Sequence, residues 1–320
     1  MSLIVTGASG FVGRGLLPAL AAAGHQGIAT GRTVSQEAPA GWAWRLRDEI
    51  LADSHGGMGI DAIVHLEVKQ HVPRPTAREI ADLERVNVEG TRAWLQWGAG
   101  HGISRFVYLS SIKAVGGGPG VHLESDSTLP ETPYGRSKAA AEAAVREWSE
   151  ASHGRVATIL RPAPVYGPGN EANLAAFVRQ ILRGRPCLVG AGASRKSIVA
   201  RRNLTAAIAF AVNRETPGCE VYNVTDAEIV SVRALATLVA ELGGCPAPRA
   251  IPSTVASVIA PLGDGLEMLT GREFPLTTSR LRALREETIF PCDKLVAAGF
   301  RHPCSLREGL IEMLEWAKAQ

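Results

Sequence analysis

The sequence predicts an α/β protein with a doubly wound parallel sheet and a smaller C-terminal domain. Short apolar runs alternate with segments of helical periodicity through the first half of the chain, which is typical of parallel strands joined by crossover helices. A glycine-rich turn separates the first strand from the first helix at residues 7–13. Proline and glycine then crowd residues 162–169, so we place a domain transition there.

The expected elements follow in order. Strands are predicted at residues 2–6, 26–30, 62–66, 105–109 and 156–160, and helices at 10–23, 80–98 and 134–149. Beyond the transition we expect helices at 173–182, 232–242 and 306–317, with returns to the sheet at 197–199 and 221–224. A cofactor-binding domain is therefore predicted at 1–162, with return segments at 196–224. The substrate-binding domain takes 163–195 and 225–320.

Composition excludes several classes of protein. Of 320 residues, 46% are apolar and 20% charged, which is ordinary globular usage. Lys and Arg number 34 against 31 Asp and Glu, a balance that argues against nucleic acid as a partner. The longest apolar stretches, at 16–23 and 255–262, are shorter than the roughly 20 residues that span a bilayer. We therefore expect no membrane-crossing segment and no membrane partner.

The cysteines and histidines indicate neither a disulfide framework nor a metal site. Five cysteines form an odd set without a CxxC pair, and the eight histidines show no HExxH spacing. A reducing cytoplasm fits this cysteine usage. The turn motif begins so early that we expect no signal peptide and a mature chain starting at residue 1.

The glycine-rich turn has the spacing of a Rossmann-type dinucleotide site. Gly7 allows a tight turn, Gly10 lets the backbone approach a pyrophosphate, and Gly13 lets the helix pack on the strand. The turn follows a predicted strand and opens a predicted helix, the context that this motif requires. The alternative is a packing turn that binds no ligand.

Tyr134 and Lys138 lie four residues apart at the start of a predicted helix, so they share one face. An ammonium beside a phenol stabilises the phenolate and lowers its pKa, and Tyr134 could then exchange a proton with a hydroxyl. Ser110 and Ser111 directly follow the strand at 105–109, at the edge where such sheets bind ligands. The alternatives are a packed aromatic beside a solvated lysine, and serines that only end a strand.

These motifs together resemble a known family. The ordered set comprises Thr6-Gly7-x-x-Gly10-x-x-Gly13, Asn87-x-x-Gly90-Thr91, Leu109-Ser110-Ser111, Tyr134-x-x-x-Lys138 and Arg161-Pro162-x-x-Val165-Tyr166-Gly167-Pro168-Gly169. It is similar to that of extended short-chain dehydrogenases/reductases of the NAD(P)-dependent nucleotide-sugar epimerase/dehydratase family. Within it, the chain looks most like the UDP-sugar 4-epimerases and 4-keto reductases of bacterial polysaccharide pathways.

The resemblance implies a catalytic set of Ser111, Tyr134 and Lys138, with Ser111 preferred to Ser110. It implies that NAD or NADP contacts Gly7, Gly10, Phe11, Val12, Gly13, Arg32, Asn87, Tyr134 and Lys138. A nucleotide-sugar substrate is expected to contact Ser111, Asn173 and Arg195, while Arg280, Arg282 and Arg285 are either a second phosphate contact or a solvated helix face. The family commonly dimerises, so we expect a homodimer that buries Trp97 and Trp148.

Four departures from the family pattern matter. Arg202 stands where Asp is usual, and Glu67-Val68 where small alanines are usual. Ile112-Lys113 replaces the Asp-Glu of dehydratases, which argues against dehydration. The second predicted strand ends in Thr30-Gly31-Arg32 without an acidic residue, and this favours NADP, because an arginine accommodates a 2′-phosphate.

The sequence therefore predicts an enzyme that oxidises or reduces carbon 4 of a nucleotide sugar, with a UDP-sugar 4-epimerase as the main interpretation. An NADPH-dependent 4-keto reductase uses the same residues and is the first alternative. A dehydrogenase of a small non-nucleotide alcohol or steroid would keep Tyr134 and Lys138 without needing Arg195. A regulator that binds NAD(P) without turnover would need only the glycine turn.

Overall fold

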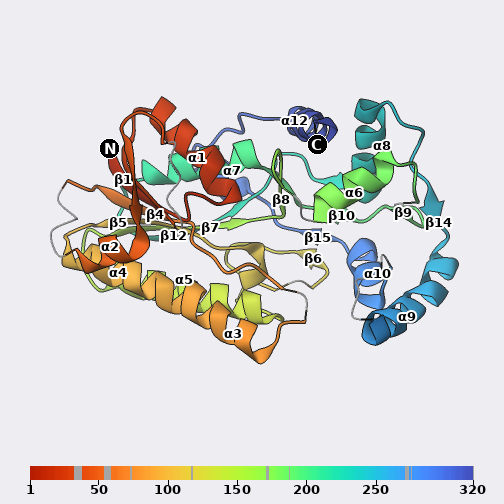
Figure 1. Ribbon diagram of the computed structural model, residues 1–320, viewed down its shortest axis with the longest axis horizontal. Helices are drawn as coiled ribbons and strands as arrows, with labels where there is room; N and C mark the ends of the chain where they lie inside the picture. The colour runs from red at the N-terminus through yellow and green to blue at the C-terminus, as the bar shows by residue number, and fades with distance from the viewer. Residues whose placement is uncertain are drawn as a thin grey trace.

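The structure is a computed structural model that describes residues 1–31, 38–53, 59–72, 74–116, 118–170, 173–186, 188–270, 274 and 276–319. A helix-covered sheet forms one lobe, and a smaller lobe of short strands and helices extends from the carboxyl ends of its strands (Figure 1). The described helices are too short or too polar to cross a bilayer.

The central sheet has seven parallel strands in the order β12-β7-β5-β4-β1-β2-β3. Their bounds are β1 Ser2–Thr6, β2 Gln26–Gly31, β3 Trp42–Leu46, β4 Ala62–His65, β5 Arg105–Leu109, β7 Val156–Pro162 and β12 Gly218–Val224. This confirms the predicted parallel α/β sheet. The expectations at 2–6, 26–30, 62–66, 105–109 and 156–160 correspond to strands of this sheet, whereas β3 was not predicted.

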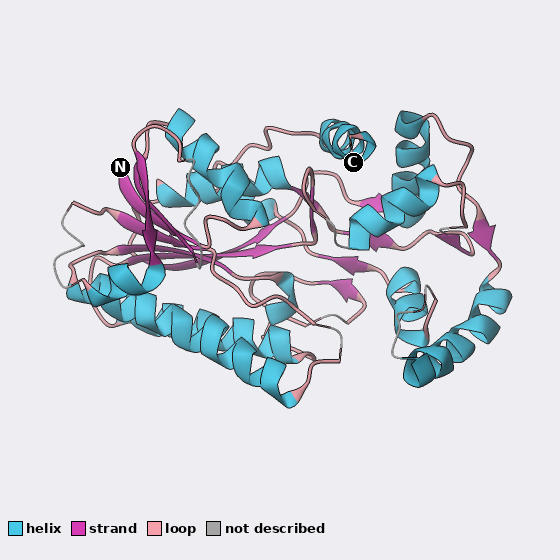
Figure 2. Ribbon diagram, in the orientation of Figure 1, coloured by secondary structure: helices cyan, strands magenta, loops and turns pink. Residues whose placement is uncertain are grey.

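Helices cover both faces of the sheet (Figure 2). On one face lie α1 (Phe11–Ala22) and α7 (Arg201–Val212), and on the other α4 (Gly90–Gly100) and α5 (Pro133–Glu150). Alternation along β1 explains the two cores, because Leu3 and Val5 join the first and Ile4 joins the second. Shorter elements on the chain are α2 (Arg47–Ala52), α3 (Ala77–Leu83), the 3₁₀ turn Ile112–Ala114 and α11 (Asp293–Ala297).

The predicted helix at 80–98 is broken where it approaches the site. A π-helical segment, Glu84–Glu89, separates α3 from α4, and such segments are frequent at functional sites. The expected return at 197–199 is also wrong: β11 (Val199–Ala200) pairs with β8 (Val165–Tyr166) in a separate two-stranded sheet. The return at 221–224 is confirmed by β12.

The smaller lobe packs around a core from α6 (Asn173–Leu182), α8 (Val232–Gly243) and α12 (Leu306–Lys318). Its four-stranded sheet has the order β13-β10-β15-β6 and includes β6 from the first half of the chain. The remaining bounds are β6 Gly120–Val121, β9 Leu188–Val189, β10 Arg195–Lys196, β13 Val230–Ser231, β14 Ala250–Ile251, α9 Ser253–Thr270, α10 Thr278–Arg285 and β15 Thr288–Ile289.

Trp97 and Trp148 do not form the dimer surface that we expected of them. Both side chains are buried within the protomer, in the core between the sheet and helices α4 and α5. They therefore have almost no area left to bury against a second copy. The homodimer itself stays a prediction.

Candidate active site

The glycine-rich turn forms a tight backbone cradle at the carboxyl end of β1. Gly7 has a φ of 64°, and a Cβ atom there would lie 2.8 Å from the backbone nitrogen of Glu67. A Cβ atom on Gly13 would lie 2.4 Å from the carbonyl oxygen of Ala8. A side chain at either position would collide with neighbouring backbone, so glycine is required at both for the turn and the start of α1 to pack this closely.

Ser111 and Tyr134 meet at the neighbouring strand end. Ser111 begins the 3₁₀ turn after β5, and its hydroxyl accepts a hydrogen bond from the Lys113 backbone N–H. Tyr134 is the second residue of α5, a helix capped by Thr132 with Pro133 in its first turn. Burial raises the pKa of Tyr134 to about 12, and a hydrogen bond with the Ser111 side chain opposes that rise. Ser110 is instead buried and donates to Glu142 Oε1 at 2.6 Å, so Ser111 is the hydroxyl beside Tyr134.

Lys138 lies one turn after Tyr134 on α5, fully buried. Its Nζ donates to the Leu109 carbonyl oxygen at 2.8 Å and to the Tyr108 hydroxyl at 3.2 Å. Burial lowers the pKa of Lys138 to about 7, and the Glu142 carboxylate acts in the opposite direction. The sequence argument that Lys138 depresses the phenol pKa is therefore wrong for this arrangement, because burial dominates at Tyr134 and the ammonium turns toward β5.

Asn87 ties two parts of the site together from within the π-helical segment. Its Oδ1 accepts from the Lys69 backbone N–H at 2.8 Å, and its Nδ2 donates to Ser137 Oγ at 2.9 Å. The side chain is completely buried. Asn87 therefore links the loop after β4 to helix α5.

A buried hydrogen-bond chain that the sequence reasoning missed runs behind the glycine turn. Thr91 donates to the Asn87 carbonyl oxygen, so its hydroxyl oxygen accepts from His65 Nε2 at 3.1 Å, and His65 Nδ1 accepts from the Thr6 hydroxyl at 2.7 Å. This pattern requires a neutral imidazole. Burial lowers the pKa of His65 to about 3, in agreement. The only signal in the sequence is a histidine within an otherwise apolar strand.

Charged groups also line the edge beside the turn. Arg47 Nε lies 3.3 Å from Glu67 Oε2, and Arg45 Nη1 lies 3.2 Å from Asp53 Oδ2. Where the family usually has small alanines, this chain therefore has a larger, charged side chain that is paired with an arginine. Arg32 lies outside the described residues, while Phe11 stacks under the Arg201 guanidinium at 5.1 Å.

The two predicted substrate contacts, Arg195 and Asn173, are not both seen in the site. Arg195 points outward and forms a two-bond ion pair with Glu287, at 2.9 and 2.8 Å. Its neighbour on β10, Lys196, is half-buried. Burial lowers the pKa of Lys196, and the positive charge of Lys113 also lowers it. Strand alternation explains the difference. Asn173 begins α6, and its side chain lies outside the described part.

The remaining arginine candidates are engaged on α10. Arg280 donates to the Phe274 carbonyl oxygen, Arg282 pairs with Glu286, and Arg285 donates to the Ser253 carbonyl oxygen. Arg202, where the family usually has Asp, pairs with Glu312 at 2.8 Å. These arginines therefore have structural contacts in this arrangement.

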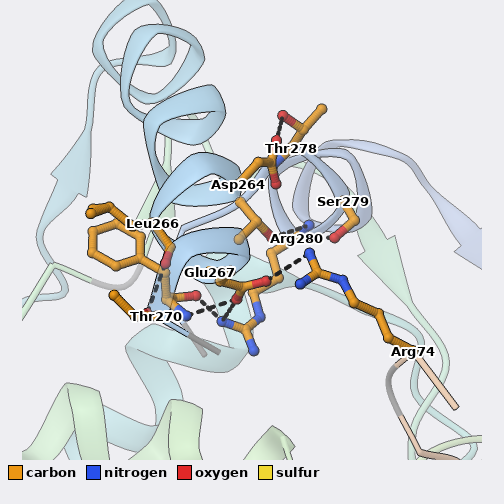
Figure 3. A network of polar contacts seen from close by, with 10 residues as sticks. Arg74, Asp264, Leu266, Glu267, Thr270, Thr278, Ser279 and Arg280 are labelled. Carbon is orange, nitrogen blue, oxygen red and sulfur yellow. Dashed lines mark hydrogen bonds and ion pairs between the residues drawn. The ribbon is translucent and has the colours of Figure 1, made fainter. Parts of the chain in front are cut away.

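The loop after β4 reaches from the site to the smaller lobe. The His71 ring lies 6.0 Å from that of Tyr134. Three residues later, Arg74 Nη2 lies 3.0 Å from Glu267 Oε2 on α9 (Figure 3). Arg74 and Glu267 thus join the two lobes at the border of the site.

The parallel sheet, the glycine cradle and the Ser111, Tyr134 and Lys138 set define an NAD(P)-binding enzyme of the short-chain dehydrogenase/reductase class. Residues 3–225 match the NAD dependent epimerase/dehydratase family. The chain belongs to this family of enzymes, as its motifs indicated.

Three similar proteins illustrate the range of the family. An N-acetyl-alpha-D-glucosaminyl-diphospho-ditrans,octacis-undecaprenol 4-epimerase of Escherichia coli O157:H7 is 29% identical, over 72% of this chain and 70% of its own. Sterol demethylase protein B of Methylococcus capsulatus strain Bath is 32% identical, over 88% and 85%. The structure of MoeE5 in complex with UDP-glucose and NAD has a TM-score of 0.74 at 25% identity, covering 100% of this chain and 99% of that one.

The residues present fit the NAD of this family. Gly10 is exposed at the amino end of α1, where a pyrophosphate is favoured. Lys138 brings an ammonium to the same sheet edge, and Tyr134 and Ser111 lie beside it. Among the described residues no group of three or more His, Cys, Asp or Glu could hold a metal ion.

Proposed function

We propose that this protein interconverts epimers at carbon 4 of a sugar carried on a nucleoside diphosphate, as a UDP-sugar 4-epimerase. The observation that carries the proposal is the meeting of Ser111, Tyr134 and Lys138 beside the glycine cradle. The 4-epimerase named above and the UDP-glucose in MoeE5 support a sugar diphosphate as substrate.

Each side chain has a separate task. The Ser111 hydroxyl hydrogen-bonds the oxygen on carbon 4, and the Tyr134 phenol oxygen exchanges a proton with it. The bound nicotinamide supplies the acceptor and donor of hydride at that carbon. The Lys138 ammonium, which is turned toward the carboxyl end of β5, is assigned to the ribose of the bound cofactor. In epimerisation, Tyr134 returns the proton that it took.

The positive charge for a diphosphate comes from two lysines in this proposal. Lys113 follows Ser111 by two residues. Burial lowers the pKa of Lys196, the Glu286 carboxylate opposes this, and the positive charge of Lys113 lowers the pKa further. Two nearby cations repel, so an anion close to both would relieve that repulsion. Lys196 Nζ donates to the Glu286 carbonyl oxygen and to Thr288 Oγ1 at 3.2 Å, neither of which is a carboxylate oxygen, whereas Arg195 forms an ion pair with Glu287. Lys196 therefore replaces Arg195 as our principal candidate for the phosphate contact.

The test is an epimerisation assay on the purified protein. UDP-glucose and UDP-N-acetylglucosamine are incubated separately with enzyme and NAD, and the products are identified by nuclear magnetic resonance. We expect the 4-epimer from at least one substrate and no 4-keto-6-deoxy product, since Ile112 and Lys113 stand where dehydratases have Asp-Glu. Absence of any epimer from UDP-sugars would contradict the proposal.

A 4-keto reductase is the second candidate, and the state of Tyr134 favours it. With a pKa of about 12 the phenol is protonated at neutral pH, ready to donate a proton to a developing alkoxide. A reductase must also exchange its cofactor after each turnover. Stoichiometric consumption of added NADPH with a 4-keto sugar nucleotide would favour this candidate.

A dehydrogenase of a non-nucleotide alcohol or steroid is supported by the similarity to sterol demethylase protein B and by the outward direction of Arg195. Equal or greater turnover of a 3-hydroxysteroid than of UDP-sugars would favour it.

A further inference from the structure

We propose that helix α9 docks the smaller lobe on an anionic membrane surface, lying in the plane of the headgroups. This inference does not depend on the proposed function. α9 lies at the outer edge of the smaller lobe, at the lower right of Figure 1. A helix that only lies on a surface does not conflict with the absence of a spanning segment among the described helices.

The evidence is an apolar ridge on the solvent side of α9. Spacings of three and four residues place its members on one face of the helix, and their exposed fractions run from 43% to 81%. The ridge is defined as Val255, Val258, Leu262, Leu266 and Leu269. Met268 is also exposed, at 79%. Large apolar patches on a protein surface mark sites of interaction.

The charges of α9 point the opposite way. Its two acidic residues are Asp264 and Glu267. Asp264 accepts hydrogen bonds from Thr278 on α10, and Glu267 contacts Arg74, Arg280 and the Phe274 N–H (Figure 3). Amphipathic surface helices normally turn charge outward. Here the charged side is packed and the apolar side is exposed, so the outer face suits a less polar phase than water.

Arginines border the amino end of the ridge. Arg285 is exposed and donates to the Ser253 carbonyl oxygen and the Ser257 hydroxyl, so it lies against the first turn of α9. Arg249 is exposed and stands four residues before α9 in the chain. α9 itself carries no Lys or Arg, but arginines close to an exposed apolar helix face attract anionic lipid headgroups. The charge therefore selects an anionic membrane.

A second copy of the chain is a poorer occupant of this ridge. A helix of 18 residues is about 27 Å long and about 10 Å wide. The ridge thus offers on the order of 300 Å², against about 800 Å² per partner in a stable protein interface. A membrane has no such minimum, because burial of each side chain contributes separately.

The experiment measures binding of the full chain to vesicles by flotation. Neutral vesicles contain phosphatidylcholine alone, and anionic vesicles contain phosphatidylcholine and phosphatidylglycerol at 3:1. The ridge variant is Leu262→Ser with Leu269→Ser. The matched control is Ile80→Ser with Ile311→Ser, which removes two exposed apolar side chains from α3 and α12. Circular dichroism and size-exclusion chromatography check that each variant is folded.

We expect the wild type and the control to float with anionic vesicles. The ridge variant should bind at least tenfold less, and Arg249→Gln should weaken binding at low salt only. Failure of the wild type to float, or equal binding by the folded ridge variant, overturns the proposal. A dimer that is lost in the ridge variant without any vesicle binding would also overturn it, in favour of a second copy.

Discussion

The Nζ atom of Lys138 lies 2.8 Å from the carbonyl oxygen of Leu109, the last residue of β5. One turn further along α5, Glu142 accepts hydrogen bonds from Ser110 at 2.6 Å and from Arg161 Nη2 on β7 at 2.6 Å. Helix α5 is thereby held to two neighbouring strands at their carboxyl ends. Buried polar contacts therefore hold in place the helix that carries Tyr134 and Lys138, the candidate catalytic pair.

Replacing Tyr134 by Phe should lower turnover at least about 100-fold while NAD still binds, because the change removes a proton-transfer group and little volume. Initial rates and a fluorescence titration of the cofactor measure the two effects. Tyr222→Phe is the matched control, since it removes a phenol hydroxyl from β12. A Tyr134→Phe enzyme that keeps more than a tenth of the wild-type rate would refute the assignment.

Replacing Glu142 by Gln should shift the pH profile of kcat/KM. The Glu142 carboxylate favours the Lys138 ammonium, so its neutralisation lowers the pKa of Lys138 below about 7. Activity that needs the ammonium should then be lost at lower pH than in the wild type. A uniform fall in rate with an unshifted profile would indicate only structural damage, which the newly unpaired Arg161 could cause.

The sequence predicts the position of a site residue better when its motif directly follows a strand or helix than when the position depends on a loop or on distant contacts. Gly7, Ser111, Tyr134 and Lys138 directly follow or begin strands and helices, and the structure brings them to one sheet edge. The motif predicts Arg195 in the site, but Arg195 is exposed and paired with Glu287, whereas Lys196, the next residue of the strand, is half-buried and donates to Thr288. The role of His65 depends on contacts with Thr6 and Thr91, 59 and 26 residues away, which no local pattern contains.

His65 should make the protein lose stability as the pH falls. Its pKa is about 3 in the folded state against 6.5 ordinarily, so between these values the unfolded chain binds the proton and the folded chain does not. The free energy of unfolding therefore falls with decreasing pH, by at most about 1.4 kcal/mol per unit from this group. Urea unfolding at pH 7 and 5 measures it. His65→Gln should show a smaller loss over the same interval, and an equal loss would contradict the prediction.

Lys196→Ala should raise the KM for a UDP-sugar about tenfold or more, the loss of a charged contact with phosphate. Arg195→Ala is the matched control, and it should change KM little because Arg195 is exposed and paired with Glu287. Initial-rate kinetics with saturating cofactor compare the two. A larger rise in KM in Arg195→Ala than in Lys196→Ala would instead assign the phosphate contact to Arg195.

The preference between NAD⁺ and NADP⁺ depends on the residues at the end of β2. The described strand ends at Gly31, and Arg32 follows where NAD-binding members of this fold place a carboxylate. The family is NAD-dependent, but an arginine in that place attracts a 2′-phosphate. A second arginine, Arg45 on β3, lies opposite Thr30 in the strand pairing, but it forms an ion pair with Asp53. We therefore expect NADP⁺ to bind more tightly than NAD⁺ to the wild type. Arg32→Ala should reverse or abolish that preference, and Arg45→Ala, the control, should keep it. Titration of both cofactors by calorimetry decides, and a preference for NAD⁺ that is unchanged in Arg32→Ala would refute the assignment.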